Sequence, residues 1–391
     1  MATREWLGRA KARAEVQTIQ VTAYDAATTY IITVNGKSVT AIAAGSVNAT
    51  ATALASAWNA ATEAEFAEIT ASANTDTVTL THDTAGVPFT VTTDESGGTG
   101  TIGNPSTTTA ATGPNHWDDA SNWSGGAVPV NSDDVYVASP VAILYGLDQS
   151  AVTLASLTIA ASFTETIGLP KTRFSGYTEY RDDYLQISAS TVKIGVGEGQ
   201  GSGRIKLNLG SVQAAIEVRK SAASAETGTP AILLLGTNAS NVLDVQGGSS
   251  VGLAAFSGEV STVATLTAVA GASVYCGEGC TLTTVRGDGS ITLNSAATTV
   301  TVSAGGVLVM NGSGAVTTLN VKEDGLCYYR SSGTVTTANI TGAVDCSTDA
   351  SSRTFTTTNL KARGRIFDPQ RTITYTNGIA VDDSVREIQA S

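Results

Sequence analysis

The chain has 391 residues and a formal net charge of −12, and only 14% of its residues are charged. Typical soluble domains have a charged fraction of roughly 25%. An acidic chain lacks the clustered Lys and Arg that phosphate contacts need, so we expect no nucleic-acid binding. The longest apolar run, AILLLG at 231–236, is strand-sized and too short to span a membrane.

The N-terminal residues 1–15 contain several basic side chains and no apolar core of the kind that a secretory signal needs. We expect this segment to be a basic arm and the chain to be made in a cytoplasm. Residues 16–103 predict a compact α+β module. Two β-rich runs at 16–24 and 29–43 open the module, and the Asn-Gly pair at 35–36 is typical of a tight hairpin turn.

Apolar residues at helical spacing predict one amphipathic helix over residues 47–62 of the module. Three strand-like runs, EFAEITASA, DTVTLTHD and VPFTVTTD, follow the helix, and the alternation in TVTLT predicts that Val78 and Leu80 are buried. This order predicts a small sheet with one helix packed on it. His82 ends a strand beside a turn, where we expect a surface residue.

A low-complexity segment at 104–115 predicts a linker between the module and a second, all-β region. From 150 to 375 the sequence is a succession of short strand-like runs without a helical pattern, and we expect 376–391 to be a C-terminal tail. The second half of the all-β region has a period, because a turn glycine recurs at intervals of 18, 17, 19, 17 and 22 residues. These glycines are Gly271, Gly289, Gly306, Gly325, Gly342 and Gly364.

Periods near 20 residues indicate stacked repeats, each too small to bury its own apolar face. Because the repeat contains no helix, we predict that residues 150–375 form a parallel β-solenoid (β-helix), in a chain that is mainly β with a small N-terminal α+β domain. About eleven coils at about 4.8 Å each would give a rod of roughly 50 Å. A β-sandwich is the alternative, but it favours wider spacing and hairpin turns. The residues predicted to stack inside are Leu266, Val269, Leu282, Val285, Val300, Val302, Leu319 and Val321.

Residues 116–149 precede the first predicted coil and are rich in tryptophan and turn residues. The first coil of a solenoid has open backbone groups that need covering. The stretch WDDASNWSGGAVPVNSDDV resembles the element that opens β-helical regions in large bacterial surface and autotransporter-like proteins. That resemblance implies a cap in which Trp117 and Trp123 close the core and Pro129 sets a turn.

The same stretch offers a metal site as the alternative, because aspartates in turns bind Ca²⁺ through oxygen ligands. Its candidate ligands are His116, Asp118, Asp119, Asp133 and Asp134. The stretch has no EF-hand spacing, and one histidine is too few for a typical transition-metal site. We therefore expect no cofactor, and Ca²⁺ is the metal that the sequence leaves open.

The segment GYTEYRDDYLQI (176–187) is the strongest candidate for binding. It interleaves aromatic, acidic and basic side chains, which suits a subunit or intramolecular interface. Aromatic rings beside carboxylates also suit glycan contact, and a carboxylate pair can hydrolyse a glycosidic bond. The candidate residues are Tyr177, Glu179, Tyr180, Arg181, Asp182, Asp183 and Tyr184. The sequence leaves all three interpretations open.

No catalytic residue is predicted. The G-x-S-x-G match around Ser250 has no histidine later in the chain to act as its base, and solenoid strands follow where that motif needs a helix. We therefore expect a protein without enzymatic activity.

The module is similar to small domains that recur in virion proteins of tailed phages, on the runs TYIITVNGKSVTAIA, AWNAAT and TVTLTHDTAGVPFTVTT. Together with the solenoid, that resemblance implies a virion structural protein assembled in the host cytoplasm, in the first place a capsid decoration or head-fibre protein. Its partners would be capsid or tail proteins and further copies of itself, as in a trimer. The arm and module would attach to the particle, and the anchor candidates are Arg4, Trp6, Arg9, Lys11 and Arg13.

Two alternative functions compete with this one. A tail-associated receptor-binding protein or spike would bind host glycan, and it would have aromatic and acidic residues along one solenoid face. A bacterial surface adhesin would need export, for which residues 1–15 carry no signal.

Overall fold

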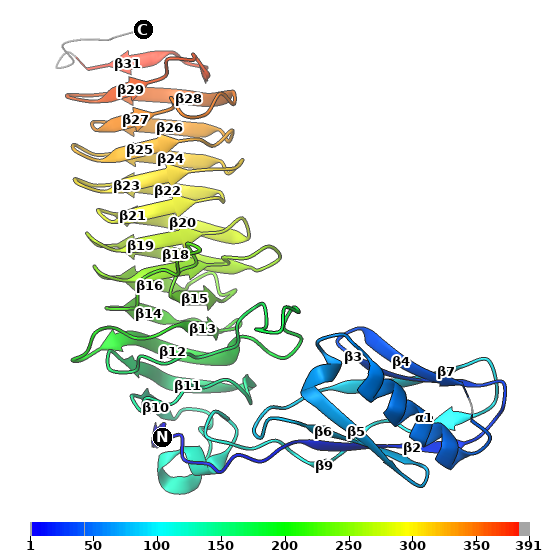
Figure 1. The fold of residues 1–391 in the computed structure, drawn as a ribbon. Coiled ribbons are helices and arrows are strands. Elements are labelled where there is room, and N and C mark those ends of the chain that lie inside the picture. Colours follow the sequence, from blue (N-terminus) through cyan, green and yellow to red (C-terminus); the bar gives the residue numbers. More distant parts are fainter. Residues whose placement is uncertain (1, 43, 383–391) are drawn as a thin grey trace.

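The computed structural model describes residues 2–42 and 44–382. The chain forms a small α+β module and a long parallel β-solenoid that rises beside it (Figure 1). The solenoid has about 12 turns, close to the eleven expected, so the predicted fold class is confirmed. Within the described residues, no helix is long and apolar enough to cross a membrane.

The secondary structure of the module spans residues 16–109. Its elements are β2 (Val16–Ala23), β3 (Thr29–Val34), β4 (Lys37–Ile42), α1 (Val47–Ala60), the 3₁₀ turn η1 (Phe66–Glu68), β5 (Ile69–Asn74), β6 (Thr77–His82), β7 (Val91–Ser96), β8 (Thr101–Ile102) and β9 (Ser106–Thr109). β5, β6, β2, β8 and β9 form one sheet, and β4, β3 and β7 form another.

The remaining elements belong to the solenoid and its cap. The cap and the first coils contain β1 (Thr3–Glu5), η2 (Ala120–Asn122), η3 (Ser124–Gly126), β10 (Asp134–Val137), β11 (Asp148–Ala160), β12 (Leu185–Val196), β13 (Ile205–Asn208), β14 (Ala215–Val218), β15 (Ile232–Leu235), β16 (Val242–Val245) and β17 (Ser250–Leu253). The later coils contain β18 (Ser261–Ala268), β19 (Ser273–Cys276), β20 (Cys280–Gly287), β21 (Ser290–Leu293), β22 (Ala297–Val302), β23 (Val307–Met310), β24 (Val316–Val321), β25 (Leu326–Tyr329), β26 (Val335–Ile340), β27 (Ala343–Asp345), β28 (Arg353–Leu360), β29 (Arg365–Phe367), β30 (Ile373–Tyr375) and β31 (Ile379–Val381).

The module follows its sequence pattern closely at the local level. The β3–β4 hairpin turns at Asn35 and Gly36, whose φ angles of 46° and 71° fit the predicted two-residue turn. α1 begins after Ser46, whose side chain accepts a hydrogen bond from the third backbone N–H of the helix. Val78 and Leu80 are buried, as predicted.

The arrangement of the module strands differs from the single sheet that we expected. β2 pairs with β6, β8 and β9, whereas the β3–β4 hairpin pairs with β7, so two sheets form. α1 packs against strands of both sheets and buries Leu54 and Trp58 in their shared core. Pairing between strands that are distant in the sequence divides the module into two sheets, and the local sequence pattern does not predict such pairing.

From β12 onward, consecutive strands alternate between two parallel sheets. The even-numbered sheet runs from β12 to β28, and the odd-numbered sheet runs from β13 to β29. Each strand pairs with the strand two places later, so each turn of the chain adds one strand to each sheet. Along strands such as β23 and β25 the side chains alternate between the solenoid interior and the solvent.

The predicted ladder of apolar side chains is buried inside the solenoid, with one exception. Leu266, Val285 and Val300 pair in register on β18, β20 and β22. Val269 is only half-buried, because β18 ends one residue earlier and Ala268 takes the inward position. The ladder therefore continues through Ala268, and Val269 begins the turn.

Close approach of stacked backbones fixes the recurring turn glycines. A Cβ at Gly342 would lie 2.1 Å from the carbonyl oxygen of Lys322 in the preceding coil, and one at Gly364 would lie 2.2 Å from that of Ile340. Among the six periodic glycines, Gly271 has a positive φ, of 81°, and the other five do not. At the other five positions, the period therefore marks places where one coil leaves no room for a side chain in the next; at Gly271, a Cβ would have its nearest neighbour at 3.6 Å, and the positive φ favours glycine instead.

Three segments differ from their expected roles. β1, within the predicted arm 1–15, pairs in parallel with β10 and is thus the first strand of the solenoid. β9, within the predicted linker 104–115, pairs with β2 of the module. β31, within the predicted tail 376–391, pairs with β28, while residues 383–391 lie outside the described residues. Each segment becomes a strand by pairing with an existing sheet edge, which its own short sequence does not indicate.

We expect Gly342→Ala to lower the free energy of unfolding of the solenoid by about 1–3 kcal/mol, because the new Cβ collides with backbone. Gly305→Asn is the matched control, since Gly305 has a φ of 80° that Asn tolerates and open space where its Cβ would be. Denaturant unfolding followed by circular dichroism measures both. Equal effects of the two substitutions would contradict the steric explanation.

Candidate functional site at the junction of module and solenoid

Three tryptophans close the first coil of the solenoid. The rings of Trp117 and Trp123 meet edge to face with centroids 4.6 Å apart, and the Trp6 ring meets Trp123 in the same way at 5.1 Å. These side chains and Pro129 are buried. The Trp6 indole N–H donates to the carbonyl oxygen of Val141 at 2.8 Å. The structure thus places the three proposed cap residues at the first coil and adds Trp6 to them.

The anchor candidates divide into two groups. Trp6 was expected to contact another protein, but its burial in the cap removes it from the surface. Arg4 is also engaged within the chain, because its Nε lies 3.4 Å from Asp133 Oδ2. The other candidates are exposed and form no ion pair with any residue of 2–42 or 44–382. They are Arg9, Lys11 and Arg13.

The five candidate metal ligands do not gather around one point. They are His116, Asp118, Asp119, Asp133 and Asp134. The buried His116 has its Nε2 2.8 Å from the carbonyl oxygen of Gly86 and its Nδ1 3.4 Å from Asp118 Oδ1, and Asp134 accepts a hydrogen bond from Ser156. Within the described residues, no group of three or more His, Cys, Asp or Glu side chains is placed to hold a metal ion. These side chains stabilise turns and strand ends.

The aromatic segment proposed for binding lies in a long loop, residues 161–184, which we call the junction loop. Figure 1 shows it leaving the solenoid between β11 and β12 and extending to the module. Tyr177 Oη donates to Glu68 Oε2 of the module at 2.6 Å and accepts a hydrogen bond from Arg181 Nη2 at 3.0 Å. Tyr180 packs against the apolar core of the module. The rings of Tyr177 and Tyr180 thus face the module.

Charged side chains form a network at this contact. Arg181 Nε donates to Glu179 Oε1 at 2.7 Å, and Arg173 Nε lies 3.4 Å from Glu179 Oε2. Both arginines also approach Glu68 of the module, at 3.6 Å for Arg181 and 3.7 Å for Arg173. The Glu179 side chain is 1% exposed and that of Arg181 6%, so removal of either would leave a buried charge without its partner. The network therefore fixes the junction loop against the module.

Glu68 lies at the centre of the network. Burial raises the pKa of Glu68, but the nearby His82 ring, the Tyr177 hydroxyl and the charges of Arg181 and Arg173 outweigh burial and lower this pKa from 4.5 to about 2. His82 is 3% exposed, with its Nε2 3.8 Å from Glu68 Oε2, so the expectation of a surface histidine is wrong. The residues that bury His82 lie outside its own strand, so the run DTVTLTHD does not predict its burial.

The last residues of the junction loop return to the solenoid. Tyr184 Oη donates to Glu259 Oε1 at 2.8 Å, and Lys206 Nζ donates to Asp183 Oδ2 at 3.1 Å. Asp182 borders a cleft of about 340 Å³ between module and solenoid, and its side chain is largely exposed. Partial burial of its carboxyl group and the nearby charge of Asp148 on β11 raise the pKa of Asp182. The contacts of this segment are therefore mostly within the chain, which matches its interpretation as an intramolecular interface.

A comparison of the chain with protein-family models, with curated proteins and with solved structures finds no match.

We expect the stabilising effect of Glu68 to depend on pH. Its pKa is lower in the folded chain than its usual value, so the stabilisation is fully present above about pH 4.5 and is lost as the pH falls toward 2. The difference in melting temperature between the wild type and Glu68→Gln, measured by calorimetry, should shrink across this window. All other carboxylates titrate in both proteins. A difference that is independent of pH would contradict the lowered pKa.

We expect Trp123→Ala to lower the free energy of unfolding by about 3–5 kcal/mol, because it removes the ring that contacts both other cap tryptophans. Tyr136→Ala on β10 is the control, since β10 pairs with β1 next to the cap but Tyr136 is 41% exposed. Denaturant unfolding followed by circular dichroism gives both values. A loss in the cap variant no larger than in the control would show that the cap does not hold the first coil.

Proposed function

We propose that the chain is a non-enzymatic structural protein of a tailed-phage particle, either a capsid decoration protein or a head-fibre protein. The observation that carries the proposal is the double connection between the module and the solenoid. The chain passes from β1 into the module and back to β10, and the junction loop grips the module through buried ion pairs. A rigid rod that is fixed to a compact domain suits a protein that covers a surface or extends from it. The similarity of the module to virion domains supports the particle as its location.

The exposed cations near the module support attachment through this end. Arg9, Lys11 and Arg13 lie between β1 and β2 at alternate positions. In a chain with a net charge of −12, three cations without ion-pair partners among the described residues create a local positive surface. Such a surface favours association with an acidic protein surface.

A glycan-binding protein of the phage tail is the second candidate. A groove of about 250 Å³ beside β19 supports it, because the residues that line this groove are all uncharged. Phe256 and Tyr275 border the groove, and the hydroxyl oxygens of Thr227 and Thr229 lie 3.1 Å apart next to them. Aromatic rings beside hydroxyl groups suit a neutral sugar ring.

Cryo-electron microscopy of particles from the source tests the proposal. Density for this chain in symmetric copies over the head would support decoration, with the module at the particle surface. Density confined to the tail tip would favour the glycan-binding candidate. Absence of the chain from particles would overturn both.

We expect the combined substitution of Arg9, Lys11 and Arg13 by Glu to lower the number of copies per particle by about tenfold or more, because it replaces attraction with repulsion. Quantitative immunoblotting of purified particles measures the copy number. The control replaces Lys193, Arg219 and Lys220, three exposed cations of the solenoid, by Glu. Equal loss in both variants would argue against attachment through the first segment.

A further inference from the structure

The outward faces of the two solenoid sheets differ in chemistry over the last coils. The even-numbered sheet exposes rows of threonine and asparagine from β22 to β28. Asn339 Nδ2 donates to Asn320 Oδ1 at 2.9 Å, and Asn359 Nδ2 donates to Asn339 Oδ1 at 2.8 Å. These side chains bond to one another along the rod, and a face of this kind is suited to contact with water.

The odd-numbered sheet exposes mainly apolar side chains in the same coils. The outward residues of β23, β25, β27 and β29 are Val307, Val309, Leu326, Tyr328, Ala343, Asp345, Arg365 and Phe367. Phe367 is 51% exposed. Parallel sheets are usually covered on both faces, so an apolar outward face on a parallel sheet indicates a surface that another molecule covers.

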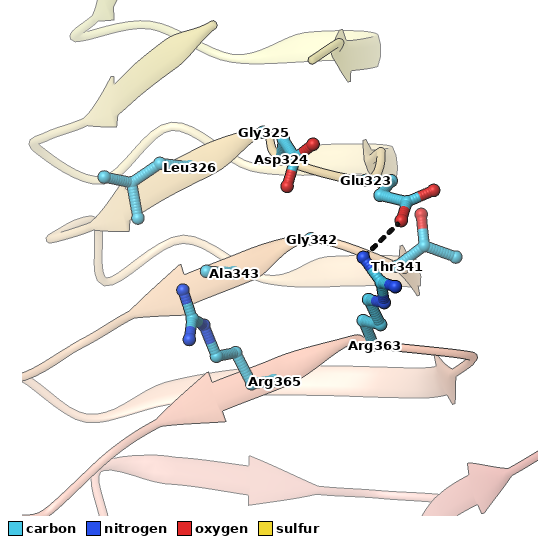
Figure 2. A pocket seen from close by; sticks show the side chains of 9 residues that line it. All are labelled: Glu323, Asp324, Gly325, Leu326, Thr341, Gly342, Ala343, Arg363 and Arg365. Carbon is cyan, nitrogen blue, oxygen red and sulfur yellow. Dashed lines mark ion pairs between the residues drawn. The ribbon is translucent and has the colours of Figure 1, made fainter. Parts of the chain in front are cut away.

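Figure 2 shows one edge of this face. Ala343 lies in register between Leu326 on β25 and Arg365 on β29, and its small side chain leaves a hollow of about 370 Å³. The ion pair of Glu323 and Arg363, with an N···O distance of 3.2 Å, borders the hollow. Both partners are highly exposed, so this pair contributes little to folding and is free to rearrange against another surface.

Charges along the two edges of the face run in opposite order. We consider charged residues at the ends of the odd-numbered strands β23, β25, β27 and β29 or within three residues of them. On the edge where the strands begin, the order is acidic, then basic: Glu323, Asp324, Arg363, Arg365. On the edge where the strands end, the order is basic, then acidic: Arg330, Asp345, Asp368. A rotation axis parallel to the rod places one edge against the opposite edge of a second copy at equal height, so opposite charges meet.

We propose that the odd-numbered sheet from β23 to β29 is the contact surface between copies of this chain, which stand side by side with their solenoids parallel. The charge order identifies the partner, because a surface whose two edges complement each other at equal height fits a rotated copy of itself. Phe367 of one copy stands at the height of Arg365, which borders the hollow, of the next. Figure 1 shows these coils far from the module, so the module does not obstruct them. The contact does not depend on which part of a particle carries the chain.

Sedimentation velocity of the full chain over a range of concentrations tests this surface with Leu326→Asp. Leu326 is half-buried and points outward, so the change places a charge in the apolar contact, and we expect the dissociation constant to rise at least about a hundredfold. Thr318→Asp is the matched control on the even-numbered sheet of the same coil, and we expect less than about a threefold change. A monomeric wild type at the highest soluble concentration, or equal effects of both variants, would overturn the proposal.

A charge exchange tests the paired edges in variants whose altered residues are exposed. Glu323→Arg and Arg330→Glu should each weaken association by about tenfold, because like charges then meet across the contact. The double variant should recover association to near the wild-type value. If the double variant loses as much association as both single variants combined, the two edges do not face each other, and the proposed arrangement is wrong. Circular dichroism melting confirms that each variant is folded.

Discussion

Backbone hydrogen bonds between strands two places apart hold each coil of the solenoid about 4.8 Å from the next, and the other features of the rod depend on that spacing. Inward side chains must stack directly on their counterparts, so apolar residues such as Leu266 and Val285 repeat in register. Where two turns come closest, even a methyl group does not fit, and Gly342 is required for that reason. The first coil has no predecessor, so tryptophan rings take the place of one.

The junction shows a different balance of forces. Glu179 and Arg181 are almost completely buried, and burial of charge is unfavourable unless each charge is paired. Such a network adds little net stability compared with apolar packing, but it accepts only one arrangement of the two parts. We infer that its role is to fix the direction of the module relative to the rod. The aromatic and charged composition of 176–187, which also suits ligand binding, is sufficiently explained by this contact.

Local pattern predicted the features that repeat and missed those that join distant segments. The glycine period and the apolar alternation predicted the solenoid, because each coil obeys the same spacing. The burial of Trp6 and His82 depends on neighbours from other parts of the chain, and no pattern within their own segments contains that information. The apolar outward face of the odd-numbered sheet was also missed, since Val307 and Leu326 read as ordinary strand residues until pairing shows which side they face.

The position of β1 has a consequence for the order of folding. The backbone N–H of Ala2 bonds to the Asp133 carboxylate 131 residues later, and closing a disordered loop of that size has a large entropic cost. The intervening module lowers that cost when it folds first, because its own ends, at Arg13 and Thr112, pair with each other. A folded module therefore replaces a long loop by two short connections and brings β1 close to β10. The solenoid then grows from a start site that the module has already assembled.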